Sequence, residues 1–402
     1  MASDGEAPAT GVASSRRAIP LELDPGTAEL LSVLRRQGPL TRAEMTAATG
    51  WARVTVTSRL ERLLDSGLLV VDETATGARG RPAVRYGIDA ARAMYLVADV
   101  GALGLRLARV DLEGRVEEAA AVIVDIGSGP ESVLKAVRSG LEALSVSADG
   151  RPVWGVGISL PGPVDFAAGR VVSPPIMTGW HGFPVRDTLS GWFGCPVLVE
   201  NDANAMAMGE LAVAFPAATD LLVVKVGTGV GCGIISGGEV VRGAAGAAGD
   251  IGHTWADVGG GQTAAPECRC GKRGCVEAYA GGWALARDVG AALGRDVSVE
   301  EVVELLVAGD AVAVRLVRDA GRVLGASLAT AVSLLNPAAV VLSGQIAVAA
   351  GEHLLAGLRE RIYARALPLA TRQVSISISE LWPDSGVHGL AREIGDLVLS
   401  GS

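Results

Sequence analysis

Two segments of the chain repeat one pattern, and this repeat constrains the fold more than any other feature. Residues 94–116, "MYLVADVGALGLRLARVDLEGRV", and residues 220–241, "DLLVVKVGTGVGCGIISGGEVV", each combine apolar strand stretches with glycine-rich turns. Strands of this apolar density are typical of a buried sheet. Each segment opens a region in which strands alternate with helices. The repeat therefore predicts an internally duplicated α/β architecture with a cleft between two lobes.

Size and composition agree with such a fold. A chain of 402 residues is too long for one hydrophobic core, so two or three domains are expected. The residues are 49% hydrophobic and 4% aromatic and include 54 glycines, which is typical of a globular α/β protein with many tight turns. Neither a signal peptide nor a membrane-spanning run is recognisable, which predicts a cytoplasmic protein. Residues 1–24, rich in alanine, serine, glycine and proline, are expected to form a flexible tail.

Residues 25–90 have a different character from the rest of the chain. Three helical stretches follow one another, and each ends at a glycine: Gly38, Gly50 and Gly67. The second stretch begins with Thr41 as N-cap and has Glu44 three residues later, which is a capping box. Two apolar stretches around the turn "TATGARGRP" then predict a two-stranded hairpin. Three helices and a hairpin predict a winged helix-turn-helix, followed by a second unit over residues 91–402.

This N-terminal unit is mildly basic within an acidic protein. Gly26–Ala90 contains nine arginines and seven acidic residues, whereas the whole chain carries a net charge of −9. A winged helix reads DNA with one helix in the major groove and its wing along the minor groove. The residues expected to face outward near the start of that helix are Arg53, Thr55, Thr57, Ser58 and Arg59. With Arg79 and Arg81 on the wing, they favour operator DNA as a partner. A winged helix used for protein contact, with solvated arginines, is the alternative.

A cluster of thiols predicts a metal site. Cys268, Cys270 and Cys275 lie within eight residues, and His253 lies a short way upstream. Zn²⁺ prefers four nitrogen or sulfur ligands in tetrahedral geometry, and this set supplies all four. No ligand position is then left for water, so the zinc would be structural. The alternative is a surface loop whose thiols are incidental.

The surroundings of the thiols resemble a known family. "GAAGAAGDIGHTWAD" followed by "CRCGKRGCVEAYAG" is similar to the signature of the ROK family, which contains sugar kinases and sugar-responsive repressors. Upstream, "VENDANAMAMGE" resembles its sugar-site motif and "VGTGVGCGIISGGEVVRGAAG" its second phosphate loop. The resemblance covers residues 91–402 nearly end to end. It implies a two-lobed actin-like ATPase fold, and "GRPAVRY" resembles the wing of the family's repressors, which its plain kinases lack.

The same resemblance assigns roles to polar residues of the expected cleft. Asp202 stands where the family places its catalytic base. Asp250, in "DIGH" for the family's "EIGH", has a side chain one methylene shorter, which can change which sugar fits. Pro175 stands where the family often has an asparagine. The further sugar contacts that the resemblance implies are Asn201, His253 (which also serves the metal), Glu277 and Trp180.

The first phosphate loop departs from the kinase pattern. In "DVGALG", Asp99 and Gly101 remain, but Ala102 and Leu103 replace a glycine and a threonine. A methyl group hinders the close approach of the backbone to a phosphate, and leucine offers no hydroxyl donor. The second loop is intact and consists of Gly227, Thr228 and Gly229. These changes argue against ATP as a ligand and against catalysis, so Asp202 is interpreted as a retained sugar contact.

The sequence therefore predicts a sugar-responsive transcriptional regulator, most simply a repressor, that binds a palindromic operator as a homodimer or homotetramer. A sugar or sugar phosphate would close the cleft and reorient the paired winged helices. An ATP-dependent sugar kinase with an accessory domain is the alternative. A protein-interaction scaffold fits less well, because so many pocket residues are kept. The identity of the sugar and the direction of its effect stay open at this point.

Overall fold

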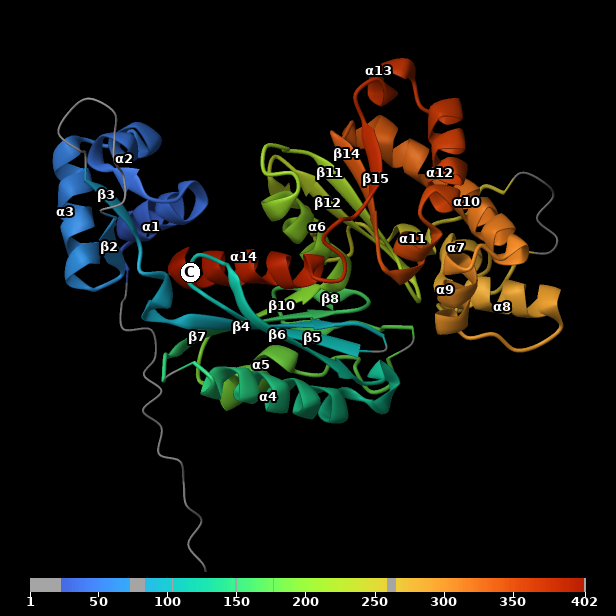
Figure 1. The fold of residues 1–402 in the computed structure, drawn as a ribbon, viewed down its shortest axis with the longest axis horizontal. Helices are drawn as coiled ribbons and strands as arrows, with labels where there is room; N and C mark the ends of the chain where they lie inside the picture. The colour runs from blue at the N-terminus through green and yellow to red at the C-terminus, as the bar shows by residue number, and fades with distance from the viewer. Residues whose placement is uncertain are drawn as a thin grey trace, which may run out of the picture.

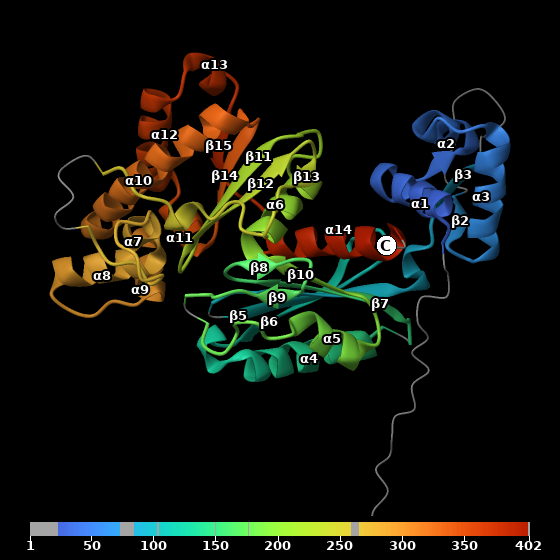
Figure 2. The ribbon, with the colours of Figure 1, turned by 180° about the vertical axis from the view of Figure 1, so that it is seen from behind.

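The computed structural model describes residues 23–72, 84–102, 104–148, 150–175, 177–258 and 265–400. Three units follow one another along the molecule: a small helical unit at the N-terminus and two lobes built on five-stranded sheets (Figures 1 and 2). Across the described ranges, no helix is both long and apolar enough to cross a bilayer.

The N-terminal unit has the arrangement of a winged helix-turn-helix. Its elements are α1 (Pro25–Gln37), β1 (Leu40–Thr41), α2 (Arg42–Thr49), α3 (Arg53–Asp65), β2 (Leu69–Asp72) and β3 (Arg85–Ile88). The strands form an antiparallel sheet in the order β1-β3-β2. The predicted capping box is confirmed, since Thr41 and Glu44 exchange side-chain and backbone hydrogen bonds. Asp24, the last residue of the expected tail, caps α1 by accepting from the backbone N–H of Thr27, and residues 1–22 lie outside the described residues.

The first lobe places a sheet between helices. Its strands are β4 (Met94–Val100), β5 (Gly104–Val110), β6 (Val116–Ile123), β7 (Val153–Leu160) and β10 (Val197–Asn201). Helices α4 (Pro130–Val146) and α5 (Val185–Phe193) cover one face, and the C-terminal helix α14 (Ser385–Ser400) covers the other (Figure 1). A short hairpin of β8 (Val164–Asp165) and β9 (Arg170–Val171) and the 3₁₀ turns η1 (Ala90–Arg92) and η2 (Ile126–Ser128) complete the lobe.

The second lobe repeats the sheet of the first. Its strands are β11 (Leu221–Val226), β12 (Val230–Ser236), β13 (Glu239–Val240), β14 (Ala339–Ser343) and β15 (Ser375–Ile378). Both sheets run antiparallel through the first three strands and parallel through the last two, in the orders β6-β5-β4-β7-β10 and β13-β12-β11-β14-β15. The predicted duplication is therefore confirmed. The lobe's helical elements are α6 (Asp202–Val213), η3 (Ile251–His253), α7 (Glu277–Ala280), α8 (Gly282–Leu293), α9 (Val299–Val307), α10 (Ala311–Leu335), α11 (Gln345–Ala350), α12 (Glu352–Arg365) and α13 (Pro368–Thr371).

Helices α6 and α14 join the two lobes. Helix α14 packs on the first sheet, α6 packs on the second, and the two helices lie against each other. They approach closely because each contributes a glycine to the crossing: a Cβ at Gly209 would lie 1.9 Å from the carbonyl oxygen of Ser385, and one at Gly389 would lie 1.8 Å from that of Ala205. Any movement of one lobe relative to the other therefore passes through this helix pair.

The far end of α14 is buried against the winged-helix unit (Figures 1 and 2). Arg35, in the last turn of α1, pairs with Asp396 at 2.6 Å and donates to the carbonyl oxygens of Ala391 and Arg392 at 2.9 Å. Leu30 and Leu34 of α1 belong to the same buried cluster as apolar residues of α14. The winged-helix unit thus shares a core with the first lobe.

Candidate functional site

A cavity of about 680 Å³ lies between the lobes and brings the predicted cleft residues together. Its lining includes the predicted sugar and phosphate residues Asp99, Gly101, Asn201, Asp202, Gly227, Thr228, Gly229, Asp250, His253 and Glu277. They come from loops and helix starts at the ends of strands in both lobes. The volume is within the range of small-molecule sites.

Asp202 is paired with a lysine. It is the first residue of α6, its side chain is buried, and its carboxylate accepts a hydrogen bond from the Nζ atom of Lys225 on β11. Burial alone would lower the pKa of Lys225, but the carboxylates of Asp202, Asp99 and Glu277 raise it above its usual value. The lysine is therefore a charged ammonium inside the cavity. Sequence reasoning missed it, although a lysine in an apolar strand two residues before a glycine loop is a visible signal.

Asn201 is largely committed to the fold. As N-cap of α6, its Oδ1 atom accepts from the backbone N–H groups of Ala203 and Asn204 at 2.9 and 3.1 Å. Its Nδ2 atom donates to the carbonyl oxygen of Gly162 at 2.9 Å. One amide hydrogen is left for a ligand hydroxyl.

Glu277, which also lines the cavity, is fixed by two hydrogen bonds. This buried residue begins α7, and its carboxylate accepts from the backbone N–H of Val230 at 3.0 Å and from the indole N–H of Trp283 at 3.2 Å. The second phosphate loop packs directly on it, because a Cβ at Gly229 would lie 2.6 Å from Glu277 Oε2. Asp250 is exposed at the start of η3 and carries no comparable support within the described residues.

Trp180 does not line the cavity, which corrects the prediction. Its side chain is fully buried in the core of the first lobe, and its indole N–H donates to the carbonyl oxygen of Ile126 at 3.2 Å. The tryptophan supports η2 and not a ligand. Two other tryptophans, Trp283 and Trp382, line the cavity. The guanidinium groups of Arg269 and Arg287 lie over the ring of Trp283 at 4.9 and 5.4 Å.

The phosphate end of the cavity keeps Asp99, a buried residue on β4. Burial raises the pKa of Asp99 to about 6; the hydrogen bond from Ser159 and the charge of Lys225 oppose the shift, and the charge of Asp202 adds to it. Ala102 also lines the cavity, whereas Leu103 lies outside the described residues. A buried carboxylate is costly to ionise, so its retention points to a role in the cleft.

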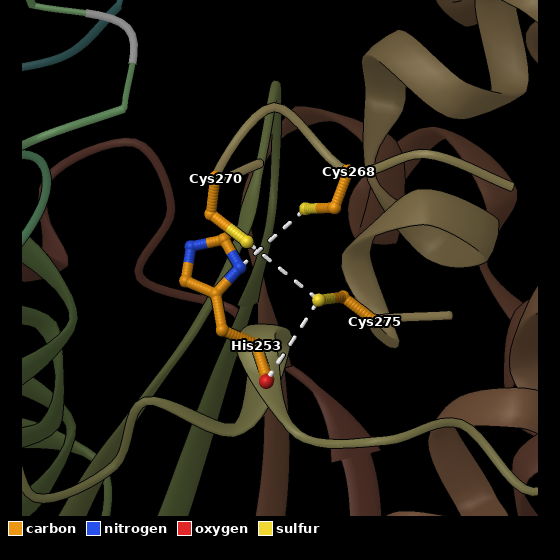
Figure 3. A group of neighbouring side chains, drawn as sticks. All are labelled: His253, Cys268, Cys270 and Cys275. Carbon is orange, nitrogen blue, oxygen red and sulfur yellow. Dashed lines mark hydrogen bonds between the residues drawn. The ribbon is translucent and has the colours of Figure 1, made fainter. Parts of the chain in front are cut away.

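The predicted metal ligands converge at the edge of the cavity (Figure 3). The ligand atoms of His253, Cys268, Cys270 and Cys275 all lie within 4.8 Å of one another. Cys270 and Cys275 have sulfurs 3.7 Å apart, and the Cys268 sulfur is 3.6 Å from His253 Nδ1. Around tetrahedral zinc, with bonds of about 2.0–2.3 Å, neighbouring ligand atoms are about 3.3–3.8 Å apart. The residues present therefore fit a tetrahedral metal ion.

On the winged-helix unit, α3 presents part of the predicted DNA face. Arg53 and Ser58 are exposed, and Thr55 and Thr57 are half-buried. Arg59 differs from the expectation, because its guanidinium lies 4.1 Å over the ring of Trp51 and against Gly26, where it packs α3 onto α1. Arg79 and Arg81 lie outside the described residues.

Sequence reasoning also missed Val54 on this face. The valine is 80% exposed between Arg53 and Thr55. An apolar side chain at the start of a recognition helix is suited to a thymine methyl group. The sequence does show that Val54 falls outside the apolar face of this helix, and that position could have drawn attention to it.

A network of charged groups runs from Glu200, the chain neighbour of Asn201, to α14. Glu200, buried on β10, accepts from Asn204 Nδ2 at 2.9 Å and from Arg242 Nε at 2.7 Å. Arg242 follows β13 in the second lobe, lies 4.0 Å over the ring of Phe166, and also pairs with Glu393 of α14. The guanidinium thus joins both lobes and α14. Glu200 and Arg242 lie within the quoted motifs, but nothing in the sequence indicated that they pair with each other and with Glu393.

The comparisons with known proteins agree with this geometry. Residues 95–394 match the ROK family. The chain is 34% identical to a glucokinase of Halalkalibacterium halodurans over 250 residues, which are 58% of this chain and 74% of that protein. It is 26% identical to a xylose repressor of Bacillus spizizenii over 374 residues, which are 90% of this chain and 92% of the repressor.

Two solved structures are similar to the chain. A ROK family transcriptional regulator, described as a homologue of the E. coli MLC protein, superposes with a TM-score of 0.79 over 94% of this chain and 96% of its own, at 23% identity, which shows the fold. A ROK hexokinase from Thermus thermophilus is 34% identical, with a TM-score of 0.62 over 74% of this chain and 96% of its own. The cleft, the metal cluster and the matched residues lead to one conclusion: the chain belongs to the ROK family.

Proposed function

We propose that this protein is a sugar-responsive transcriptional repressor that binds operator DNA through α3 and an effector in the interlobe cavity. One observation carries the proposal: the winged-helix unit shares a hydrophobic core with the lobes that form the ROK cleft. In that cleft Asp202, at the position of the kinases' catalytic base, is paired with Lys225. The similarity to a xylose repressor over 90% of the chain supports it. A homodimer or homotetramer on a palindromic operator suits this fold.

We also propose that Zn²⁺ occupies the site of His253, Cys268, Cys270 and Cys275. Three thiolates and one imidazole form a closed set, which is typical of structural zinc. Cys275 is followed by Val276, the N-cap of α7, and then by Glu277. A metal ion at the thiols would therefore fix the wall from which Glu277 faces the cavity.

A sugar kinase is the second candidate function. The intact loop of Gly227, Thr228 and Gly229 and the likeness to a glucokinase favour it. The altered first loop and the Lys225–Asp202 pair oppose it, because phosphoryl transfer needs a carboxylate that is free to accept a proton. Radiolabelled phosphate transfer from ATP to a panel of sugars measures this activity directly.

The test of the repressor function is a mobility-shift titration on DNA from upstream of the protein's own gene, at fixed salt, with and without each sugar and sugar phosphate of a panel. We expect specific binding that one effector changes. Arg53→Ala should weaken operator binding roughly tenfold, the effect of losing a base or phosphate contact of about 1–3 kcal/mol.

Arg372→Ala is the matched control. This exposed arginine follows α13 in the second lobe and carries the same charge far from α3, so its loss should change operator binding less than twofold. If both variants lose the same amount of operator affinity, the loss is an effect of net charge, and Arg53 is not a DNA contact. Operator binding that no effector changes would leave a repressor without its sugar response.

A further inference from the structure

Lys225 lines the cavity. It lies on β11, opposite Gly231 of β12 and Ser343 of β14, and directly precedes Val226 and the glycine loop. Its side chain is 18% exposed and that of Asp202 is 7% exposed. The ammonium group therefore lies between the start of α6, where the sugar residues gather, and the loop that a kinase would use for phosphate.

The pair with Asp202 changes what this carboxylate can do. The carboxylate of Asp202 accepts a charge-assisted hydrogen bond from the ammonium group, which fixes its position and engages one of its oxygens. It remains a good acceptor for a ligand hydroxyl, which needs only a lone pair. It is a poor general base, because protonating it would break its charge-assisted pair with the buried lysine.

The other charged groups of the cavity decide what charge a ligand can carry. Four carboxylates line it, those of Asp99, Asp202, Asp250 and Glu277, against the three cationic groups of Lys225, Arg106 and Arg269. Arg106 is paired with Asp384, and Arg269 lies over the ring of Trp283. A phosphate dianion would have to displace Asp202 from Lys225 or face the remaining carboxylates. An uncharged polyhydroxyl ligand can bind without breaking the Lys225–Asp202 pair and without repulsion from the carboxylates.

We propose that Lys225 is the specificity-determining residue of the cleft: its pair with Asp202 holds that carboxylate as the acceptor for a hydroxyl of the effector and leaves no unpaired ammonium for a phosphate ester, so the effector is an unphosphorylated sugar. This inference rests on the proposed sugar response. It assigns the lysine a role in selecting the ligand, and it accounts for the absence of phosphoryl transfer that the proposed function expects.

The experiment is titration calorimetry on the full chain with pentoses, hexoses and the phosphate esters of the same sugars. We expect one unphosphorylated sugar to bind at least tenfold more tightly than its phosphate ester. Lys225→Met should weaken that sugar at least tenfold without improving the ester. Lys135→Met, at an exposed position on α4, is the matched control and should leave both affinities within twofold.

Because Lys225→Met leaves Asp202 without its partner, the double variant Lys225→Met/Asp202→Asn removes both charges and guards against failure to fold. If the pair acts as one unit, the double variant should lose about as much sugar affinity as either single variant. Tighter binding of the phosphate ester by the unmodified protein, unchanged sugar affinity in a folded Lys225 variant, or phosphoryl transfer from ATP would each overturn the inference. An operator-binding protein to which no sugar and no ester binds would instead overturn the proposed sugar response itself.

Discussion

At the residue scale, the buried carboxylate of Asp99 in the cleft lowers the stability of the folded protein. Its pKa in the folded protein, about 6, lies above the pKa of 3.8 of an unfolded aspartate side chain, so the folded state binds the proton more tightly. The destabilisation is therefore absent below about pH 4 and complete above about pH 6, where Asp99 is ionised. Each unit of pKa shift corresponds to about 1.4 kcal/mol, which makes this cost about 1–3 kcal/mol.

Asp99→Asn should therefore stabilise the protein by about 1–3 kcal/mol at pH 8 and by clearly less at pH 4.5. The amide can still accept the hydrogen bond from Ser159. Urea unfolding at the two pH values measures the difference. Asp187→Asn, at a 72% exposed position on α5, is the control and should change stability little at either pH. A stabilisation of equal size at both pH values would show that ionisation of Asp99 is not its cause.

At the element scale, the segment that carries Cys268, Cys270 and Cys275 leads directly into α7. Its sharp turns are built on Gly271 and Gly274, both with positive φ, and a Cβ at Gly274 would lie 2.8 Å from the ring of Trp255. Such a short segment has little apolar core of its own. The start of α7 therefore depends on whatever holds the four ligands together.

Cys268→Ser should lower the bound zinc from about one ion per chain to well below one and weaken sugar binding at least tenfold, while operator affinity stays within threefold. Atomic absorption, calorimetry and mobility shifts measure the three quantities. Cys195→Ser, in the first lobe away from the cluster, should keep the metal. Full zinc content in the Cys268 variant would remove this thiol from the ligand set.

At the scale of the whole molecule, Arg242 joins the parts that an effector would move. Its partners are Glu200 of the first lobe and Glu393 of α14, and one turn further along α14 Asp396 pairs with Arg35 of the winged-helix unit. A ligand that closes the lobes would shift Arg242 relative to α14. Contiguity alone does not demonstrate coupling, so the coupling has to be measured.

Arg242→Met should keep sugar affinity and operator affinity within about threefold while reducing the effect of the sugar on operator binding to less than twofold, since allosteric coupling energies are typically about 1–3 kcal/mol. Mobility shifts with and without sugar measure the response. Arg322→Met, which breaks ion pairs with Asp319 and Glu360 on the second lobe, is the control and should respond normally. A normal response from the Arg242 variant would exclude this residue from the coupling.

The same network predicts a pH dependence. Burial raises the pKa of Glu393 to about 7; Arg242 opposes the shift, and Glu200 and Asp396 add to it. As the pH falls from 8 to 6, Glu393 takes up a proton and its pairing with Arg242 weakens. The sugar response of the unmodified protein should therefore be larger at pH 8 than at pH 6, and Glu393→Gln should give a small response at both.

The sequence by itself determined several features whose partners are close along the chain. The capping box joins Thr41 to Glu44, the thiols lie within eight residues, and each glycine-rich hairpin pairs neighbouring strands. Such features depend on local geometry, which composition and spacing reveal. The repeated hairpins therefore predicted both lobes, and the matched motifs predicted the residues of the cleft.

Only the tertiary structure decided which distant side chains meet. Lys225 pairs with Asp202 because β11 lies beside α6, Arg242 reaches Glu393 across 151 residues, and Arg35 reaches Asp396 across 361. The placement of Trp180 in the core, against the prediction, has the same origin. The sequence does not distinguish an aromatic or charged side chain that faces a ligand from one that packs against another helix or strand. Burial and the packing of elements far apart in the chain settle which it does.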